Sequence, residues 1–203
     1  MGFNETPDFQ SRIKKAQGPN KKEKMSPITS HLPCTFEEIF SGSKKKIKIT
    51  RSRYCNTSNV MKDEIKILSL KIKPWWKEGT RIIFHGEGDD TQENLPGDIV
   101  FILKELKHKH FRRNGDDLVF VANISLIEAL TDCILKIPTI DKRTLLLACP
   151  EVMSPNYERV IQSEGMPKKN EMERGNLVIK FSITFPKTID KHKKSQLRNL
   201  LQN

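Results

Sequence analysis

The sequence predicts a mainly β protein built from two β-rich units in tandem, with short helices in the units and one helix at the C-terminal end. Two observations support this prediction. Segments at the start and at the end of the first unit recur, in the same order, in the second unit. Between them, apolar and polar residues alternate as they do in half-buried strands. The composition agrees, because a hydrophobic content of 36% and an aromatic content of 7% suit thin sheet layers.

The two units begin alike. Residues 35–49 (TFEEIFSGSKKKIKI) resemble residues 125–139 (SLIEALTDCILKIPT). Each copy has a hydroxyl residue followed three positions later by a glutamate, the pattern of a helix capping box, and then an alternating strand. These pairs are Thr35 with Glu38 and Ser125 with Glu128. The pattern predicts short helices over residues 36–40 and 125–130.

The two units also end alike. Residues 84–105 and 161–183 each contain a Glu-Gly pair, a polar loop, a second glycine and a strand of apolar and β-branched residues. We expect positive φ at these glycines, since they fall in turns before the last strand. They are Gly88 and Gly97 in the first unit and Gly165 and Gly175 in the second. Matching starts and matching ends predict a duplicated unit.

The other elements follow from alternation and from turn residues. Strands of the first unit are predicted near 31–35, 44–51, 66–73, 80–84 and 98–106. Strands of the second unit are predicted near 117–123, 133–138, 143–148, 158–162 and 176–185. The domains that follow are a disordered leader over 1–26, a first domain over 27–109 and a second domain over 110–186. A hairpin-like turn at Asn114-Gly115 joins the two units.

The end of the chain, residues 187–203, has apolar residues at helical spacing after Pro186. These residues are Ile189, Leu197, Leu200 and Leu201. They predict a short amphipathic helix with one apolar stripe, too short to be stable alone. Because exposed apolar stripes usually find a partner, we expect this helix to pair two chains in a homodimer.

The composition limits the classes of function. A formal net charge of +11 favours acidic partners such as nucleic acid, an anionic membrane or an acidic peptide. No apolar run approaches the roughly 20 residues of a membrane span, and no signal peptide begins the chain, so a cytoplasmic protein is expected. The four cysteines lack metal-ligand spacing and fit reduced thiols. Without a catalytic motif or a phosphate loop, no enzyme, cofactor or metal is expected.

Three motifs are specific in combination: Trp-Lys-x-Gly-Thr at 76–80, Phe-x-Arg-x-Gly-x-Asp-Leu at 111–118 and Glu-Gly-x-Pro at 164–167. With them, residues 27–201 resemble the C-terminal region of class B DnaJ-type co-chaperones, the type without a zinc finger. The resemblance implies two β-sandwich-like domains in series and a C-terminal helix that pairs two chains into a horseshoe. Trp75 stands where the family usually has glycine, which puts the tight turn before Trp76 in question.

The resemblance also implies a shallow apolar groove in the first domain. This groove takes unfolded client segments and the acidic Glu-Glu-Val-Asp tail of a DnaK-type chaperone. Carried over by position, the groove is lined by Leu32, Ile47, Ile49 and Phe111, with Lys45 and Lys48 at its rim. From periodicity alone, Ile47 and Ile49 fit the sandwich core, Phe111 fits core or groove equally, and the lysines fit a solvated face.

The function implied is a co-chaperone module that holds unfolded or partly folded polypeptides and engages the acidic tail of the DnaK-type chaperone. The chain has no His-Pro-Asp tripeptide, so it is not expected to stimulate the partner's ATPase unaided. A structural assembly subunit on the same dimeric scaffold, without client binding, is the alternative. Nucleic acid fits the charge, but no helix-turn-helix, zinc finger or RNP-type aromatic pair occurs. No membrane partner is expected.

Overall fold

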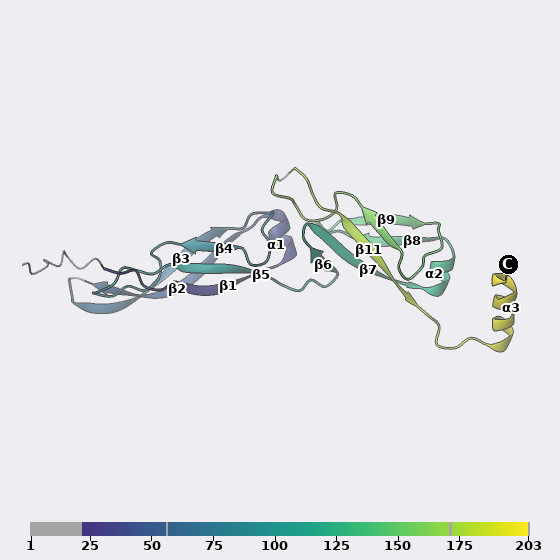
Figure 1. Cartoon of the computed structure of the whole chain (residues 1–203), viewed down its shortest axis with the longest axis horizontal. Coiled ribbons are helices and arrows are strands. Elements are labelled where there is room, and N and C mark those ends of the chain that lie inside the picture. The colour runs from purple at the N-terminus through teal and green to yellow at the C-terminus, as the bar shows by residue number, and fades with distance from the viewer. Residues whose placement is uncertain (1–21, 56, 171, 203) are drawn as a thin grey trace, which may run out of the picture.

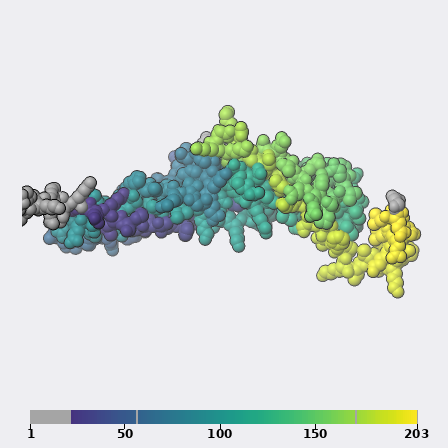
Figure 2. Space-filling model, in the orientation of Figure 1, coloured from purple at the N-terminus to yellow at the C-terminus, as the bar shows by residue number. Residues whose placement is uncertain are grey.

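The computed structural model describes residues 22–55, 57–170 and 172–202. The molecule is elongated, with two β units end to end and a helix that stands apart at the C-terminal end (Figures 1 and 2). The first unit contains β1 to β5 with α1, the second contains β6 to β11 with α2, and the last helix is α3. The structure therefore confirms the mainly β fold class.

The first unit combines a three-stranded sheet with a two-stranded hairpin. The sheet has the order β1-β5-β4, with β1 parallel and β4 antiparallel to β5. Strands β2 and β3 form the antiparallel hairpin. The elements are β1 (Ile28–Cys34), α1 (Phe36–Ser41), β2 (Lys44–Cys55), β3 (Val60–Lys71), β4 (Arg81–Phe84) and β5 (Ile99–Glu105).

The second unit has the same parts and one additional strand. Its sheet has the order β10-β11-β7-β6, and β8 and β9 form the hairpin. The additional strand, β6, pairs antiparallel with β7 through the predicted Asn114-Gly115 turn. The elements are β6 (Phe111–Asn114), β7 (Asp117–Ser125), α2 (Leu126–Leu130), β8 (Cys133–Pro138), β9 (Thr144–Cys149), β10 (Glu158–Ile161) and β11 (Leu177–Thr184).

The repeated element order confirms the duplication that the sequence predicts. From β1 and from β7, each unit continues with a short helix, a hairpin and two further strands. In both units the strand before the short helix pairs in parallel with the last strand of the unit: β1 pairs with β5, and β7 pairs with β11. Both short helices carry the predicted capping box. Local signals therefore locate corresponding elements in both copies.

The four repeated glycines allow two backbone segments to approach each other closely. None of them has positive φ, so the expectation of positive φ was wrong. The N–H of Gly165 donates to the carbonyl oxygen of Gly175 at 2.8 Å. A Cβ atom at Gly175 would lie 2.0 Å from the carbonyl oxygen of Asp116, which leaves no room for a side chain. In the first unit, Gly88 donates to Gly97 in the same way at 2.9 Å.

The core lies between the sheet and the hairpin of each unit. In the first unit, Leu68 and Leu70 of β3 and Leu103 of β5 are buried. In the second unit, Ile137 of β8 and Ile179 of β11 are fully buried. Each hairpin thus has an inner apolar face and an outer face open to solvent, as in a sandwich.

The β2–β3 hairpin is longer than predicted. It continues beyond the apolar alternation because ion pairs replace apolar contacts near its tip. Arg51 is 8% exposed and donates two hydrogen bonds to Glu64, the shorter at 2.8 Å. It also forms an ion pair with Glu87, in the loop between β4 and β5. Because the residues in this part of the hairpin are largely charged, apolar periodicity did not predict it.

Part of the predicted disordered leader is ordered. Residues 1–21 lie outside the described residues. In the described part, the N–H of Met25 donates to the carbonyl oxygen of Leu95 at 3.0 Å, and the N–H of Leu95 donates to the carbonyl oxygen of Glu23 at 2.8 Å. These bonds fix residues 23–25 to the loop before β5.

The C-terminal helix α3 spans Lys191–Leu201, which is shorter than the predicted 187–203. Asp190 is its N-cap residue and has an extended backbone, so Ile189 precedes the helix instead of lying on it. The apolar stripe of α3 itself therefore consists of Leu197, Leu200 and Leu201.

The turn before Trp76 forms although Trp75 replaces the usual glycine. The N–H of Trp76 donates to the carbonyl oxygen of Lys73 at 3.1 Å. Trp75 does not have positive φ, so this turn has no need of glycine. The Lys73 ammonium lies 5.3 Å from the centre of the Trp75 ring, where a cation–π contact is favourable.

Across the described ranges, none of the helices is both long enough and apolar enough to cross a membrane. In the same ranges, no three His, Cys, Asp or Glu side chains gather where they would hold a metal ion. All four cysteines are free thiols.

Candidate functional site

Strand β2 carries the predicted site, and its alternation separates the side chains onto two faces. Ile47 and Ile49 are half-buried and pack against the core, and Lys45 is on their face. Lys48 is exposed on the opposite face. The two lysines expected at one rim therefore lie on opposite sides of the strand, a consequence of the period of two in a strand.

Lys45 is already engaged inside the chain. Its ammonium lies 2.7 Å from a carboxylate oxygen of Glu38 in α1 and donates a hydrogen bond to the carbonyl oxygen of Pro33 at 2.6 Å. These contacts connect β2 to α1 and to β1. A carboxylate of a bound peptide therefore has to compete with Glu38 for the Lys45 ammonium.

Strands β1 and β2 each have one edge without a strand partner among the described residues. β1 is the end strand of its sheet, and β2 pairs only with β3. The Lys45 side chain reaches Pro33 of β1, which shows that the two strands are neighbours at this point. An unpaired edge presents N–H and C=O groups to which an extended peptide can add as a further strand.

Two of the expected lining residues are buried in the core. Leu32 is 4% exposed and Phe111 is 3% exposed. Phe111 is the first residue of β6, and its ring stacks on His108 with ring centres 5.0 Å apart. The accessible apolar surface of the site is therefore supplied by Ile47 and Ile49.

His108 joins the two units. Its ring also stacks on Phe36 of α1, with ring centres 5.6 Å apart. Its Nε2 lies 3.1 Å from a carboxylate oxygen of Glu37, and its Nδ1 accepts the N–H groups of His110 and Phe111. Sequence reasoning missed this role, because a lone histidine between units has no spacing signature.

Arg113 makes a second connection between the units. One of its guanidinium nitrogens donates to Glu105 at 2.6 Å and to the carbonyl oxygen of Trp76 at 2.9 Å. Nearby, the Lys77 ammonium lies 2.9 Å from a carboxylate oxygen of Asp116. Two of the three motifs recognised in the sequence supply all of these residues except Glu105, but only the structure shows that these two motifs meet at the junction.

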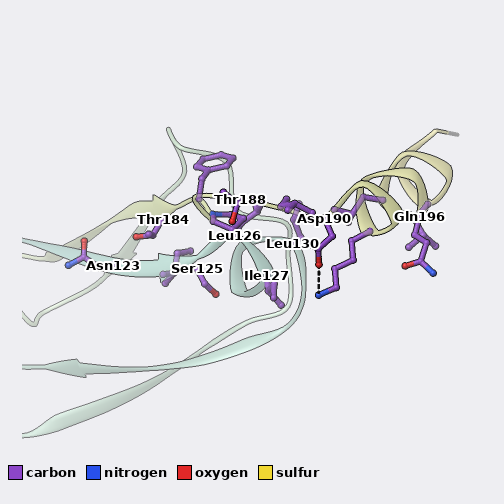
Figure 3. Close-up of a pocket in the computed structure, with 16 residues that line it drawn as sticks. Asn123, Ser125, Leu126, Ile127, Leu130, Thr184, Thr188, Asp190 and Gln196 are labelled. Atoms are coloured by element: carbon purple, nitrogen blue, oxygen red, sulfur yellow. Dashed lines mark ion pairs between the residues drawn. The ribbon is translucent and has the colours of Figure 1, made fainter.

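A second candidate site is a cavity of about 1040 Å³ between the second unit and α3. Its lining comes from the end of β7, from α2, from the segment after β11 and from α3, as Figure 3 shows. Leu197 and Leu200 line it from α3, and Ile189 lines it from the connecting segment. Leu201 is 68% exposed and is not among the lining residues.

Sequence reasoning did not include α2 in this surface. Ile127 and Leu130 lie three residues apart in α2, are 73% and 40% exposed, and line the cavity. Phe185, directly after β11, is 64% exposed and also lines it. The sequence did contain a signal for this surface, because residues three apart lie on the same side of a helix, as Ile127 and Leu130 do. Ala129 is the residue of α2 that is buried.

The fold defines the class of protein. It is a mainly β protein with two copies of one unit, followed by an exposed amphipathic helix. Comparison with known proteins gives the family. Residues 28–186 match the DnaJ C terminal domain family. Human DnaJ homolog subfamily B member 5 is 42% identical over 187 residues, which cover 92% of this chain. The chain belongs to the DnaJ C-terminal domain family.

Other relatives agree. Human DnaJ homolog subfamily B member 13 is 40% identical over 189 residues, covering 91% of this chain and 59% of that protein. DnaJ protein homolog 1 of Drosophila melanogaster is 38% identical over 191 residues, covering 93% of this chain and 57% of that protein. The match to human subfamily B member 5 covers 54% of that relative. The chain thus spans a little over half the length of these relatives.

Proposed function

We propose that this chain is the polypeptide-binding module of a DnaJ-type co-chaperone. Its first unit holds extended segments of unfolded polypeptides and binds the acidic Glu-Glu-Val-Asp tail of a DnaK-type chaperone. The observation that carries the proposal is that β1 and β2 each have an edge without a strand partner in the part of the chain that the structure describes, beside the half-buried Ile47 and Ile49. Membership of the family supports the same function.

The side chains at this site make unequal contributions. An apolar anchor that becomes fully buried contributes about 1.5–3 kcal/mol, whereas an exposed ion pair contributes about 0–1 kcal/mol. Ile47 and Ile49 therefore set the affinity for apolar segments, and Lys48 sets the preference for an acidic tail. Lys45 contributes less than its position suggests, because Glu38 already neutralises it.

The test is a titration with a peptide that ends in Glu-Glu-Val-Asp, followed by amide chemical shifts. We expect shifts in β1 and β2, and Lys48→Glu weakens binding about three- to tenfold. Lys48→Ala weakens it less, because reversal of charge adds repulsion to the lost attraction. Ile49→Ser weakens both this peptide and apolar clients, since it removes apolar surface that both use.

Lys136→Glu is the matched control, because Lys136 is an exposed lysine on β8, the first hairpin strand of the second unit. It should leave binding of the tail unchanged. Added salt should weaken the tail and spare apolar clients, since exposed charges are screened over about 10 Å at 0.1 M. Shifts confined to the second unit, or no effect of Lys48→Glu, contradict the assigned site. A dimer that binds neither tail nor client supports the alternative, a structural assembly subunit.

We further propose that the second functional surface is a homodimer contact. The cavity between α2 and α3 has apolar walls, and Leu200 of α3 is 73% exposed beside it. An isolated helix of this length is marginal in water, so α3 needs a partner to be stable. A second copy of α3 has the apolar stripe that fits this cavity.

A further inference from the structure

Cys133 and Cys149 lie opposite one another across the β8–β9 hairpin. Cys133 is the first residue of β8 and Cys149 is the last residue of β9, and the antiparallel register pairs them directly. Directly opposed residues have Cα atoms about 4.5–5.5 Å apart, within the range of about 4.4–6.8 Å that a disulfide spans. The next pair, Ile134 with Ala148, is exposed, so both cysteines are on the inner face.

The surroundings of the two thiols keep them in the protonated form. The Cys149 thiol donates a hydrogen bond to the carbonyl oxygen of Leu147 at 4.0 Å. Burial raises the pKa of both thiols, and the neighbouring Glu128 and Asp132 raise that of Cys133 further. Arg159 acts in the opposite direction on Cys149, without reversing the effect of burial. Both thiols therefore stay protonated near neutral pH, which slows their exchange with a disulfide oxidant, because the thiolate is the attacking form.

We propose that Cys133 and Cys149 are a redox pair, which a low-molecular-weight disulfide such as oxidised glutathione converts to an intramolecular disulfide. Cys133 is half-buried and Cys149 is 5% exposed, so Cys133 is the cysteine that meets the oxidant. Its thiolate attacks the glutathione disulfide, forms a mixed disulfide and releases one glutathione. Cys149 then loses its proton, attacks the Cys133 sulfur and displaces the second glutathione. Two cysteine thiols are oxidised by two electrons, and one disulfide is reduced to two thiols.

The consequence of the bond follows from its place in the fold. The turn after Pro138 closes one end of the hairpin, and the disulfide closes the other end, next to α2. The N–H of Met153, shortly after β9, donates to the carbonyl oxygen of Ala129 in α2 at 2.9 Å. The bond therefore fastens the start of β8, shortly after α2, to the end of β9, whose continuation contacts α2. A cross-link of this kind restricts the unfolded chain, so oxidation stabilises the second unit.

The test uses the full chain with Cys55→Ser, which removes the one cysteine whose thiol has a lowered pKa. The protein is incubated with oxidised glutathione, its remaining thiols are alkylated, and it is digested with trypsin without reduction. We expect one cross-linked product, which joins the tryptic peptides 114–136 and 144–159. Thermal unfolding should move upward by several degrees, and dithiothreitol should reverse both changes.

Single substitutions separate the two steps. With Cys149→Ser, Cys133 should retain one glutathione, and the rise in unfolding temperature should be absent. With Cys133→Ser, the buried Cys149 should remain a free thiol. The proposal is overturned if the folded parent protein keeps Cys133 and Cys149 reduced, or if Cys133 accumulates as a stable mixed disulfide while Cys149 is present. Peptide binding by the first unit is measured in the same samples and should be equal in both redox states, so this test is independent of the proposed function.

Discussion

At the scale of single residues, neighbouring groups make the four cysteines chemically different. Cys34 has no exposed surface, and burial raises the pKa of its thiol. Cys55 is at the end of β2, next to the hairpin tip. Hydrogen bonds from Ser58 and Thr57 lower the pKa of Cys55 to about 6. Because the thiolate is the reactive form, Cys55 is the most nucleophilic cysteine of the chain at neutral pH.

This difference predicts the order of alkylation. With iodoacetamide at pH 7, Cys55 should react first, and its rate should reach half of its maximum near pH 6. Mass spectrometry of peptides at a series of pH values measures these rates. Ser58→Ala should move the midpoint upward, because it removes the hydrogen bond with the largest effect. The matched variant Cys34→Ser should leave the fast phase intact. A midpoint near pH 9 for Cys55 contradicts the assignment.

At the scale of elements, the two short helices depend on their capping boxes. In α2, the Ser125 hydroxyl accepts the Glu128 N–H at 3.2 Å, and the Glu128 carboxylate accepts the Ser125 N–H at 2.7 Å. The Ser125 hydroxyl also donates to this carboxylate at 2.8 Å. The two bonds that the Ser125 backbone N–H and hydroxyl donate to the carboxylate lower the pKa of Glu128 from 4.5. A helix of five residues has few internal hydrogen bonds, so the cap satisfies a large share of its free N–H groups.

Ser125→Ala should therefore lower the free energy of unfolding by about 1 kcal/mol at pH 7. Ser125→Thr keeps the hydroxyl group and should cost much less. Because the Glu128 pKa is lowered in the folded state, its contribution is present above pH 4.5 and is lost as the pH falls through the folded value. Urea unfolding measures the free-energy difference between the parent protein and Ser125→Ala, which should be smaller at pH 3 than at pH 7. An equal loss for the alanine and threonine variants would show that the cap does not stabilise α2.

At the scale of the whole molecule, the elongated shape leaves α3 with few contacts to the rest of its own chain (Figure 1). All described residues of α3 are exposed. Its N-terminal half carries Lys191, Lys193 and Lys194, and none of its first-turn residues is acidic. Two copies of this helix repel each other electrostatically while their leucines attract. The proposed dimer is therefore sensitive to salt.

Removal of residues 187–203 should convert a dimer to a monomer, measured by light scattering. Leu200→Asp should have the same effect in the full chain, since Leu200 lines the cavity beside α2. Asn199→Asp is the matched control, because Asn199 is exposed on α3 but is not among the lining residues. Added salt should strengthen the dimer by screening the lysines. An intact chain that is already monomeric at micromolar concentration rules the dimer out.

Local patterns in the sequence were sufficient to identify the elements and their repetition. The capping boxes, the Asn114-Gly115 turn and the strands of both units depend on residues close together in the chain, and the structure confirms them. Family resemblance was sufficient for the fold class and for naming the residues of a peptide site. That site remains a prediction, and its strand is where the sequence placed it.

Only the tertiary structure decided which side chains meet. The Lys45 contact with Glu38 depends on the packing of α1 against β2. The register of β8 and β9 brings Cys133 and Cys149 together at the open end of their hairpin. The physical reason is the same in each case. Propensity and periodicity act over a few neighbouring residues, whereas register and packing are set by the burial of apolar surface between segments far apart in the chain.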